Sequence, residues 1–201
     1  MPLRPSRQRS VAFAVRISPS KAGFRKDTSA LARTGQDFAA PQRIVETVIA
    51  VNDARKRAMV DKIRDAMDDR LAGKRVAVFG VTFKPNTDDM RDAPALTIVP
   101  ALIGAGAEVR VSDPEGEAEG AALLPGVTWV EDPYSCVAEA DALVVITEWN
   151  QFRALQWNRL KDVLASPLVI DLRNIYAPAM VAKEGFQYHS VGRPTVSSHE
   201  D

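Results

Sequence analysis

The 201-residue sequence has little of several features on which common classes of protein depend. It has one cysteine, Cys136, which excludes an intramolecular disulfide framework and a zinc site built on cysteines. No stretch of about 18 uninterrupted apolar residues occurs, so the sequence predicts no helix that crosses a membrane. Its 26 basic and 26 acidic residues cancel, which argues against a general nucleic-acid binder. We therefore expect neither nucleic acid nor a membrane among its partners.

Two further absences concern catalysis and nucleotide binding. The histidines, His189 and His199, have no Asp or Ser at a diagnostic spacing, so the sequence predicts no Ser-His-Asp triad and no metal site. No G-x-G-x-x-G follows an apolar run, because Gly80 stands alone and Gly104 and Gly106 come after the next predicted helix. Without that dinucleotide fingerprint, a nucleotide would have to be held by side chains and a loop.

The charge is unevenly distributed along the chain. Residues 1–33 carry eight Lys or Arg and one acid, Asp27. This end has no apolar segment followed by a small-residue cleavage site, so it is not a secretory signal, although its composition is faintly similar to that of a mitochondrial transit peptide. We predict a disordered basic arm over residues 1–26, a polar tail over residues 195–201 and a cytoplasmic protein.

Residues 27–72 show the periodicity of helices. Asp27 or Thr28 can cap a first helix. Apolar residues then recur at helical spacing and predict one long helix over residues 42–71, which ends at Gly73. A helix of that length is about 45 Å long, more than one small domain covers. We expect it to mediate a homodimer; alternatively, it lies along its own domain.

Residues 74–194 alternate short apolar runs with helical patterns, which predicts a doubly wound α/β domain with a mostly parallel six-stranded sheet, preceded by the long helix. Runs such as RVAVFGVTF and ALVVIT are nearly continuous in apolar residues, as in strands covered on both faces. The predicted strands are residues 75–83, 108–112, 127–130, 142–147, 168–172 and 187–191. The predicted helices are residues 94–103, 134–140, 151–164 and 177–184.

Ligands of such sheets bind beyond the carboxyl ends of the strands, and cations gather there in this sequence. Lys84 follows the first predicted strand, Arg91 precedes the next helix, and Arg173 follows the fifth strand. A point charge and a forked donor suit a phosphate, and the N-terminus of a helix adds partial positive charge. Lys84 and Arg91 are equally able to form ion pairs within their own loop, with Asp88, Asp89 or Asp92.

Two more residues, Asp113 and Trp149, have two interpretations each, and Cys136 has one. Asp113 stands where a dinucleotide-binding domain places its ribose carboxylate, but the missing glycines favour a turn aspartate before Pro114. Trp149 can cover a ligand or close the core, and the core is favoured. Cys136 lies on an apolar face and is predicted to be a buried structural thiol.

The stretches FGVTFKPNTDDMRDAPAL, ITEW, VIDLRN and KDTSALARTGQDFAAPQRIVETVIAVNDARK resemble the UDP-glucose/GDP-mannose dehydrogenase family. The resemblance covers about residues 24–193, corresponds to the central helix and C-terminal half, and favours the UDP-glucose 6-dehydrogenase branch. It implies that residues 74–194 bind a UDP-sugar, that the long helix forms a dimer, and that a separate N-terminal Rossmann domain binds NAD. It also implies two hydride transfers that take a C6 alcohol to a carboxylate, through a cysteine nucleophile.

The same resemblance implies roles for individual residues. Phe83 and Lys84 match the family's pair that contacts the substrate, and Arg173 matches the arginine that reaches the UDP-sugar. Arg91 matches an arginine that reaches the phosphates of the cofactor. Asp27 matches the catalytic aspartate in the family's G-G-S-C-F-P-K-D-T motif.

That motif is also where the sequence departs from the family. Here it is KAGFRKDT, with Gly23 in place of the nucleophilic cysteine and Arg25 in place of the proline. Cys136 does not substitute, because it belongs to a different predicted helix and domain. We expect the C-terminal part of a UDP-glucose 6-dehydrogenase, inactive as a lone chain, with foreign residues added by a frameshift or a misplaced start.

Two functions other than that of a dehydrogenase fragment remain as alternatives. A genuine short protein would be a non-catalytic UDP-sugar-binding or dimerisation module. An unrelated CoA- or NAD-binding Rossmann domain is disfavoured because the glycine fingerprint is missing.

Overall fold

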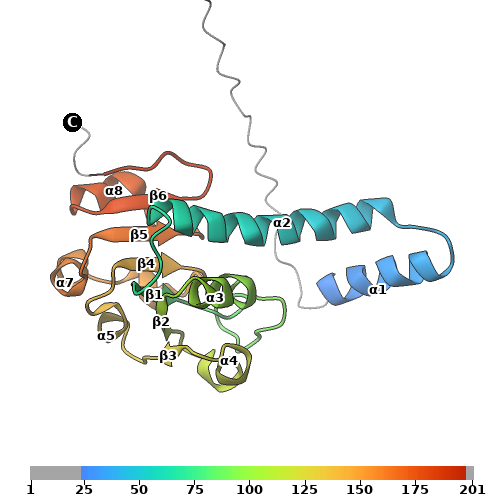
Figure 1. Ribbon diagram of the computed structural model, residues 1–201, viewed down its shortest axis with the longest axis horizontal. Helices are drawn as coiled ribbons and strands as arrows, with labels where there is room; N and C mark the ends of the chain where they lie inside the picture. Colours follow the sequence, from blue (N-terminus) through green and yellow to red (C-terminus); the bar gives the residue numbers. More distant parts are fainter. Residues whose placement is uncertain (1–23, 198–201) are drawn as a thin grey trace, which may run out of the picture.

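A computed structural model describes residues 24–197, and a six-stranded sheet lies at its centre (Figure 1). The strands are β1 (Arg75–Phe79), β2 (Glu108–Ser112), β3 (Thr128–Trp129), β4 (Ala142–Val145), β5 (Leu168–Asp171) and β6 (Gln187–Ser190). Their order is β3-β2-β1-β4-β5-β6, and every neighbouring pair is parallel. The chain changes direction across the sheet between β1 and β4, which makes that the switch point. The predicted doubly wound α/β fold is confirmed.

The central strands are apolar on both faces because both faces are covered. All residues of β4 and β5 are buried, as are all but the first residue of β1. Val78 of β1 is in register with Val111 of β2 and Val144 of β4, so apolar side chains form a row across the sheet. The outer edge of β6 is partly closed by an antiparallel bridge between Tyr188 and Val196.

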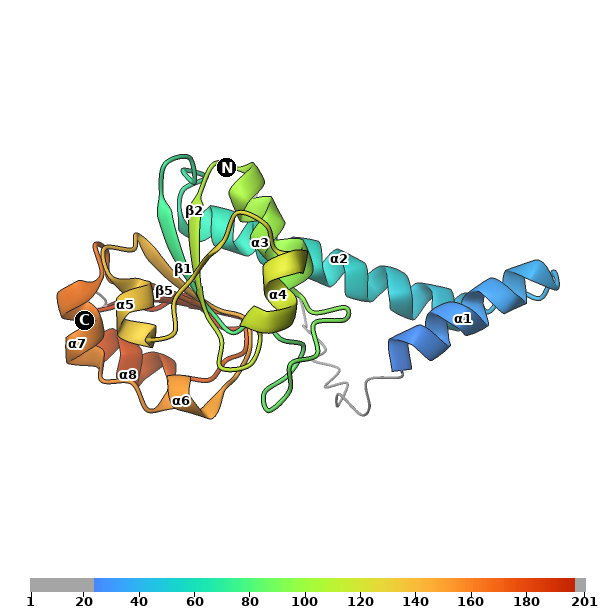
Figure 2. The same ribbon diagram turned by 90° about the horizontal axis from the view of Figure 1, so that it is seen from below.

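The helices form two layers, one on each face of the sheet (Figure 2). On one face lie α2 (Arg43–Ala66), α3 (Ala95–Gly104) and α4 (Glu117–Leu123). On the other lie α5 (Pro133–Val137), α6 (Asn150–Arg153), α7 (Trp157–Val163) and α8 (Pro178–Lys183). Val78 belongs to the first core, whereas the next residue, Phe79, stacks on Phe152 in the second, with ring centroids 4.5 Å apart. Side chains of one strand therefore serve both cores.

Helices α1 (Phe24–Asp37) and α2 form a hairpin that projects from the α/β domain (Figures 1 and 2). Helix α2 has 24 residues and is unbroken, about 36 Å long, which confirms the predicted long helix. Only its C-terminal part joins the core, where Ile63 is fully buried. Gln36 Nε2 of α1 donates to Glu46 Oε1 of α2 at 3.0 Å, and Ala32 of α1 is buried.

Several predicted boundaries are wrong. Helix α2 ends at Ala66 instead of residue 71, because the two aspartates that follow Met67, Asp68 and Asp69, have positive φ angles of 51° and 58°. Gly73 therefore lies in the connection to β1 and does not end the helix.

The start of α1 also differs from the prediction. The helix begins at Phe24, so Asp27 and Thr28 lie inside it and neither is its N-cap. The predicted helix over residues 151–164 is two helices, α6 and α7, because Gln156 between them is extended and its N–H donates to the Tyr134 hydroxyl at 2.9 Å.

Two errors concern β1 and α4. The predicted strand over residues 75–83 ends at Phe79, because Gly80 has a φ of +77° and begins a loop. Helix α4 was not predicted, because Gly116 and Gly120 weaken the helical pattern of its segment. The other predicted strands and helices agree with the structure to within three residues at each end.

Some predictions fall outside the described part of the chain. Residues 1–23 of the predicted basic arm lie outside it, as do residues 198–201 of the predicted tail. Residues 24–26, which were predicted to belong to the arm, are the first residues of α1. Between residues 24 and 197, no helix is long and apolar enough to cross a membrane. The same range contains no group of three or more His, Cys, Asp or Glu residues that could hold a metal ion.

Candidate functional site

The loop that follows β1 is held at the switch point by hydrogen bonds to side chains that follow the two neighbouring strands, β2 and β4. Asp113, directly after β2, accepts hydrogen bonds from the backbone N–H groups of Val81 at 2.7 Å and Thr82 at 3.1 Å. Thr147, after β4, donates from Oγ1 to the carbonyl oxygen of Thr82 at 2.5 Å. The backbone of this loop is thus fixed at the carboxyl edge of the sheet, where ligands of doubly wound folds bind.

Asp113 is saturated with donors from the protein itself. Its Oδ2 also accepts from Thr82 Oγ1 at 3.1 Å and Trp149 Nε1 at 3.2 Å, and its Oδ1 accepts from the N–H groups of Glu115 at 3.0 Å and Gly116 at 2.8 Å. A carboxylate has about four lone-pair positions, so none is left for a ribose. The turn interpretation of Asp113 is confirmed, and the structure adds a second role, that of fastening the loop after β1.

Gly80 is required by a close approach and not by a pyrophosphate. A Cβ at this position would lie 2.5 Å from Thr147 Cβ and 2.8 Å from the Thr147 carbonyl oxygen. With Asp113 already occupied and no G-x-G-x-x-G in the sequence, the described residues do not fit NAD bound in the manner of a Rossmann domain.

Phe83 and Lys84 lie on this fastened loop. The Phe83 N–H donates to the Asp89 carbonyl oxygen at 2.8 Å. The single Thr82 hydroxyl proton is shared between Asp113 Oδ2 at 3.1 Å and the Lys84 carbonyl oxygen at 3.3 Å. Within residues 24–197, the Lys84 ammonium makes no ion pair and no hydrogen bond. The backbone of Lys84 is therefore held in place while its charge stays available to an anion.

Arg91 takes the alternative of an ion pair within the loop. Its Nε and Nη2 donate to the two carboxylate oxygens of Asp89, both at 2.9 Å. These hydrogen bonds are the main cause that lowers the pKa of the Asp89 carboxyl below its ordinary value, against the opposing effect of burial. The Arg91 side chain is 74% exposed and the Asp89 side chain 13%, so water reaches the guanidinium but hardly the carboxylate.

Arg173 is held by a residue from the adjacent strand. Its Nε donates to Glu148 Oε2 at 2.5 Å and its Nη2 donates to Glu148 Oε1 at 2.6 Å. Burial raises the pKa of Glu148 most, but the hydrogen bonds and charge of Arg173 outweigh it, so the net pKa is lowered. Glu148 was not among the site residues predicted from the sequence. The signal that could have found it is an ionisable side chain directly after the predicted strand over residues 142–147.

Asp171 fixes the backbone beside Arg173. It is fully buried at the end of β5 and accepts hydrogen bonds from Arg173 N at 2.9 Å, Ile175 N at 2.7 Å and the Tyr188 hydroxyl at 2.7 Å. Burial first, and the neighbouring Asp171 next, raise the pKa of Tyr188, so its hydroxyl stays protonated and donates. The turn that carries Arg173 is therefore as well anchored as the loop that carries Lys84.

The structure places most of the predicted site residues at one edge of the sheet. Phe83, Lys84 and Arg91 share the loop after β1, and Arg173 follows β5 at the same carboxyl edge, with β4 between them. Gly23 and the Asp27 side chain lie outside the described part of the chain, so their predicted roles are not placed by the structure.

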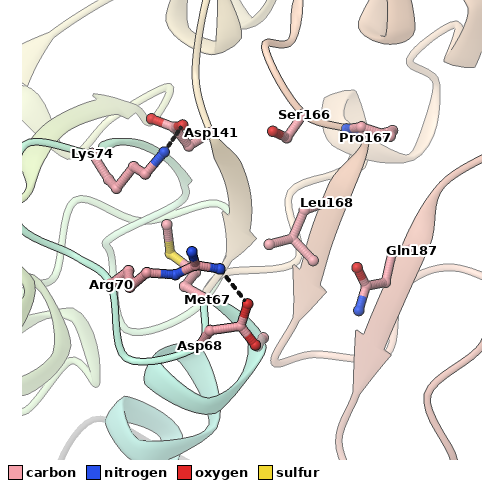
Figure 3. Close-up of a pocket in the computed structure, with 10 residues that line it drawn as sticks. Met67, Asp68, Arg70, Lys74, Asp141, Ser166, Pro167, Leu168 and Gln187 are labelled. Carbon is pink, nitrogen blue, oxygen red and sulfur yellow. Dashed lines mark hydrogen bonds and ion pairs between the residues drawn. The ribbon is translucent and has the colours of Figure 1, made fainter.

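A cavity of about 420 Å³ lies at the opposite, amino-terminal edge of the strands (Figure 3). It is bordered by the end of α2 and by the beginnings of β5 and β6. Its charged side chains already form ion pairs, Lys74 Nζ with Asp141 Oδ1 at 2.8 Å and Arg70 Nη2 with Asp68 Oδ2 at 2.7 Å. None of the predicted site residues lines this cavity.

Cys136 and Trp149 belong to the core. Both side chains are buried in the cluster on the α5–α8 face of the sheet, which confirms the two core interpretations. Burial raises the pKa of the Cys136 thiol to about 12, so it stays protonated at neutral pH and is a poor nucleophile. The two ring nitrogens of His189 in β6 contact neighbouring polar side chains, Nδ1 with Thr195 Oγ1 at 3.2 Å and Nε2 with Gln187 Nε2 at 3.0 Å.

Comparison with known proteins connects this geometry to a family. Residues 77–178 match the UDP-glucose/GDP-mannose dehydrogenase family, UDP binding domain. The chain belongs to this family. The match includes Phe83, Lys84, Arg91 and Arg173, and it confirms the resemblance found in the sequence.

Relatives in the family are UDP-glucose 6-dehydrogenases. The enzyme of Rhizobium meliloti is 56% identical over 171 residues, which cover 85% of this chain and 39% of that protein. The enzyme of Pseudomonas aeruginosa is 38% identical over 177 residues, with coverages of 85% and 39%. The UDP-glucose dehydrogenase structure from Pyrobaculum islandicum superposes with a TM-score of 0.73 at 30% identity, over 87% of this chain and 38% of that one. The chain thus corresponds to about two fifths of the length of these relatives.

Proposed function

We propose that this chain is the UDP-sugar-binding part of a UDP-glucose 6-dehydrogenase, and that Phe83, Lys84 and Arg173 contact the UDP-sugar. One observation carries the proposal: the Lys84 ammonium has no ion-pair partner within residues 24–197 and stands on a fastened loop at the switch-point edge. An anionic diphosphate is a ligand that such a cation binds strongly through charge-assisted hydrogen bonds. The match to a UDP binding domain over the same residues supports this choice of anion.

In the proposed reaction, UDP-glucose becomes UDP-glucuronate and NAD is the hydride acceptor. Because the described residues do not fit NAD as a Rossmann domain does, NAD would be bound by another part of the enzyme. Arg91 would reach the phosphates of the cofactor by exchanging its ion pair with Asp89 for them. Asp27 would be the catalytic aspartate.

The 201 residues on their own are proposed to have no dehydrogenase activity. Gly23 occupies the position of the family's nucleophilic cysteine, and loss of a nucleophile costs orders of magnitude in rate. The assay is NADH formation with saturating UDP-glucose and NAD. Steady NADH formation would contradict this proposal. UDP binding without NADH formation agrees with it, and is also expected of the alternative, a non-catalytic UDP-sugar-binding module.

The projecting hairpin supports a homodimer. Four large apolar side chains on it are exposed: Leu31 by 49%, Phe38 by 79%, Ile44 by 82% and Val51 by 59%. Ile44 and Val51 are seven residues apart and so share one face of α2. Sedimentation of the parent is expected to give a dimer, and Ile44→Ser with Val51→Ser a monomer; a monomeric parent at micromolar concentration would contradict the proposal.

Calorimetry with UDP tests the binding site. Arg173→Ala is expected to weaken UDP binding about tenfold, and Lys84→Ala with Arg173→Ala about a hundredfold, if each cation supplies about 1.4 kcal/mol. The matched control is Arg70→Ala with Lys74→Ala, which removes the same charges from the cavity at the opposite edge. The proposed site is refuted if the parent and the Lys84 and Arg173 double variant bind UDP equally well. If the control variant loses affinity for UDP, the binding site lies at the opposite edge of the sheet instead.

A further inference from the structure

Glu148 is the only group that holds the Arg173 guanidinium among the hydrogen bonds found within residues 24–197. It follows β4, the strand between those that precede Lys84 and Arg173, so it stands in the middle of the proposed site. The neighbouring Arg153 donates instead to the Ile175 carbonyl oxygen at 3.1 Å. The Glu148 carboxylate is thus committed to Arg173 through both of its oxygens.

The contact uses one edge of the guanidinium and leaves the other open. Nε and one N–H of Nη2 point to Glu148, so both N–H groups of Nη1 and the second N–H of Nη2 are not used by that carboxylate. The backbone of Arg173 is fixed separately, because its N–H donates to Asp171. Glu148 therefore controls the one part of Arg173 that would otherwise rotate freely, its side chain.

We propose that Glu148 is a positioning residue of the UDP-sugar site, which orients Arg173 so that its open edge binds the diphosphate. This inference rests on the proposed function. Glu148 does not touch the ligand; it acts by fixing the arginine before the ligand arrives. The Glu148 side chain is 26% exposed and the Arg173 side chain 33%. Because most of each side chain is shielded from water, the ion pair is well ordered.

Two opposing effects decide the sign of a Glu148 substitution. Ordering an arginine side chain in advance is worth about tenfold in affinity, since that conformational entropy is no longer lost on binding. Removing the carboxylate also relieves its repulsion of the bound anion, which water and salt screen to a gain of only about twofold in affinity. Glu148→Gln is therefore expected to weaken UDP binding about fivefold.

A double-mutant cycle with UDP calorimetry tests whether Glu148 acts through Arg173. The four proteins are the parent chain, Glu148→Gln, Arg173→Ala and the double variant, each checked for folding by circular dichroism. The fivefold effect of Glu148→Gln is expected to vanish when Arg173 is already alanine. Glu139→Gln is the matched control, because Glu139 pairs with Arg75 at 2.8 Å where β1 begins, and it should leave UDP affinity unchanged.

Each outcome decides the proposal. An equal effect of Glu148→Gln in both backgrounds, no effect, or tighter UDP binding would overturn the positioning role while leaving the UDP site intact. No UDP binding by the parent would overturn the proposed function itself, and this inference with it. As a readout that needs no ligand, the Nε–H signal of Arg173 in nuclear magnetic resonance should exchange slowly with water in the parent and rapidly in Glu148→Gln.

Discussion

Gly80 and Gly73 provide a controlled test of how tightly the site loop approaches β4. Their φ angles are nearly the same, +77° and +73°, so alanine suffers the same backbone strain at either position. Their surroundings differ completely. A Cβ at Gly80 would lie 2.5 Å from Thr147 Cβ, whereas a Cβ at Gly73 meets nothing within 4 Å.

The loss of stability expected for each alanine variant follows from its backbone strain and from the contacts of its new Cβ. Positive φ costs an alanine about 1 kcal/mol, so Gly73→Ala should lower the free energy of unfolding by about that much. Gly80→Ala adds a collision that includes the backbone oxygen of Thr147, 2.8 Å away, which cannot rotate aside. Overpacking of that kind costs about 2–3 kcal/mol more.

Thermal unfolding followed by circular dichroism measures the difference. One kcal/mol shifts Tm by about 2–4 °C in a chain of this size, so Gly80→Ala should unfold about 8 °C below Gly73→Ala. Gly80→Ala should also weaken UDP binding, since the loop that carries Lys84 begins there. Equal Tm values for the two variants would refute the argument that the approach to Thr147 demands glycine.

Three more predictions follow from single contacts. Asp113→Asn should lower the free energy of unfolding by about 2 kcal/mol, since the new NH2 group is a donor and would face some of the six donors that the carboxylate now accepts from. Asp88→Asn, at an exposed position in the loop after β1, should change Tm little. Cys136, with a pKa of about 12, should resist thiol reagents at pH 8 in native protein and react in urea; fast native labelling would contradict its burial. Burial, and next the charge of Lys62, lower the pKa of His189 below its ordinary value of 6.5. The unfolded chain therefore binds the proton more readily, so the free energy of unfolding should be highest above about pH 6.5 and fall as the pH drops below it. His189→Gln should flatten that pH dependence.

The sheet and the long helix could be predicted because their signals are local. β4 and the first three residues of β5 are apolar, and every residue of both strands is buried. The sequence pattern alone distinguishes such runs from half-exposed strands. The 3.6-residue periodicity of α2 likewise predicts one continuous helix. The point where each element ends was less predictable. β1 ends at Phe79, and the amides of Val81 and Thr82 then donate to Asp113, 32 and 31 residues further along the chain.

The sequence by itself determined which residue types stand after each strand, and its motifs suggested Phe83, Lys84, Arg91 and Arg173 as candidates for the site. It left open which of these cations are paired, since an ion pair depends on the distance between atoms that separate elements carry. Only the tertiary structure decided that Arg91 binds its neighbour Asp89 and that Arg173 binds a carboxylate 25 residues away, whereas Lys84 has no ion pair with any residue between 24 and 197. The parallel order of β1, β4 and β5 brings these side chains to one edge, and that order is a property of the folded sheet.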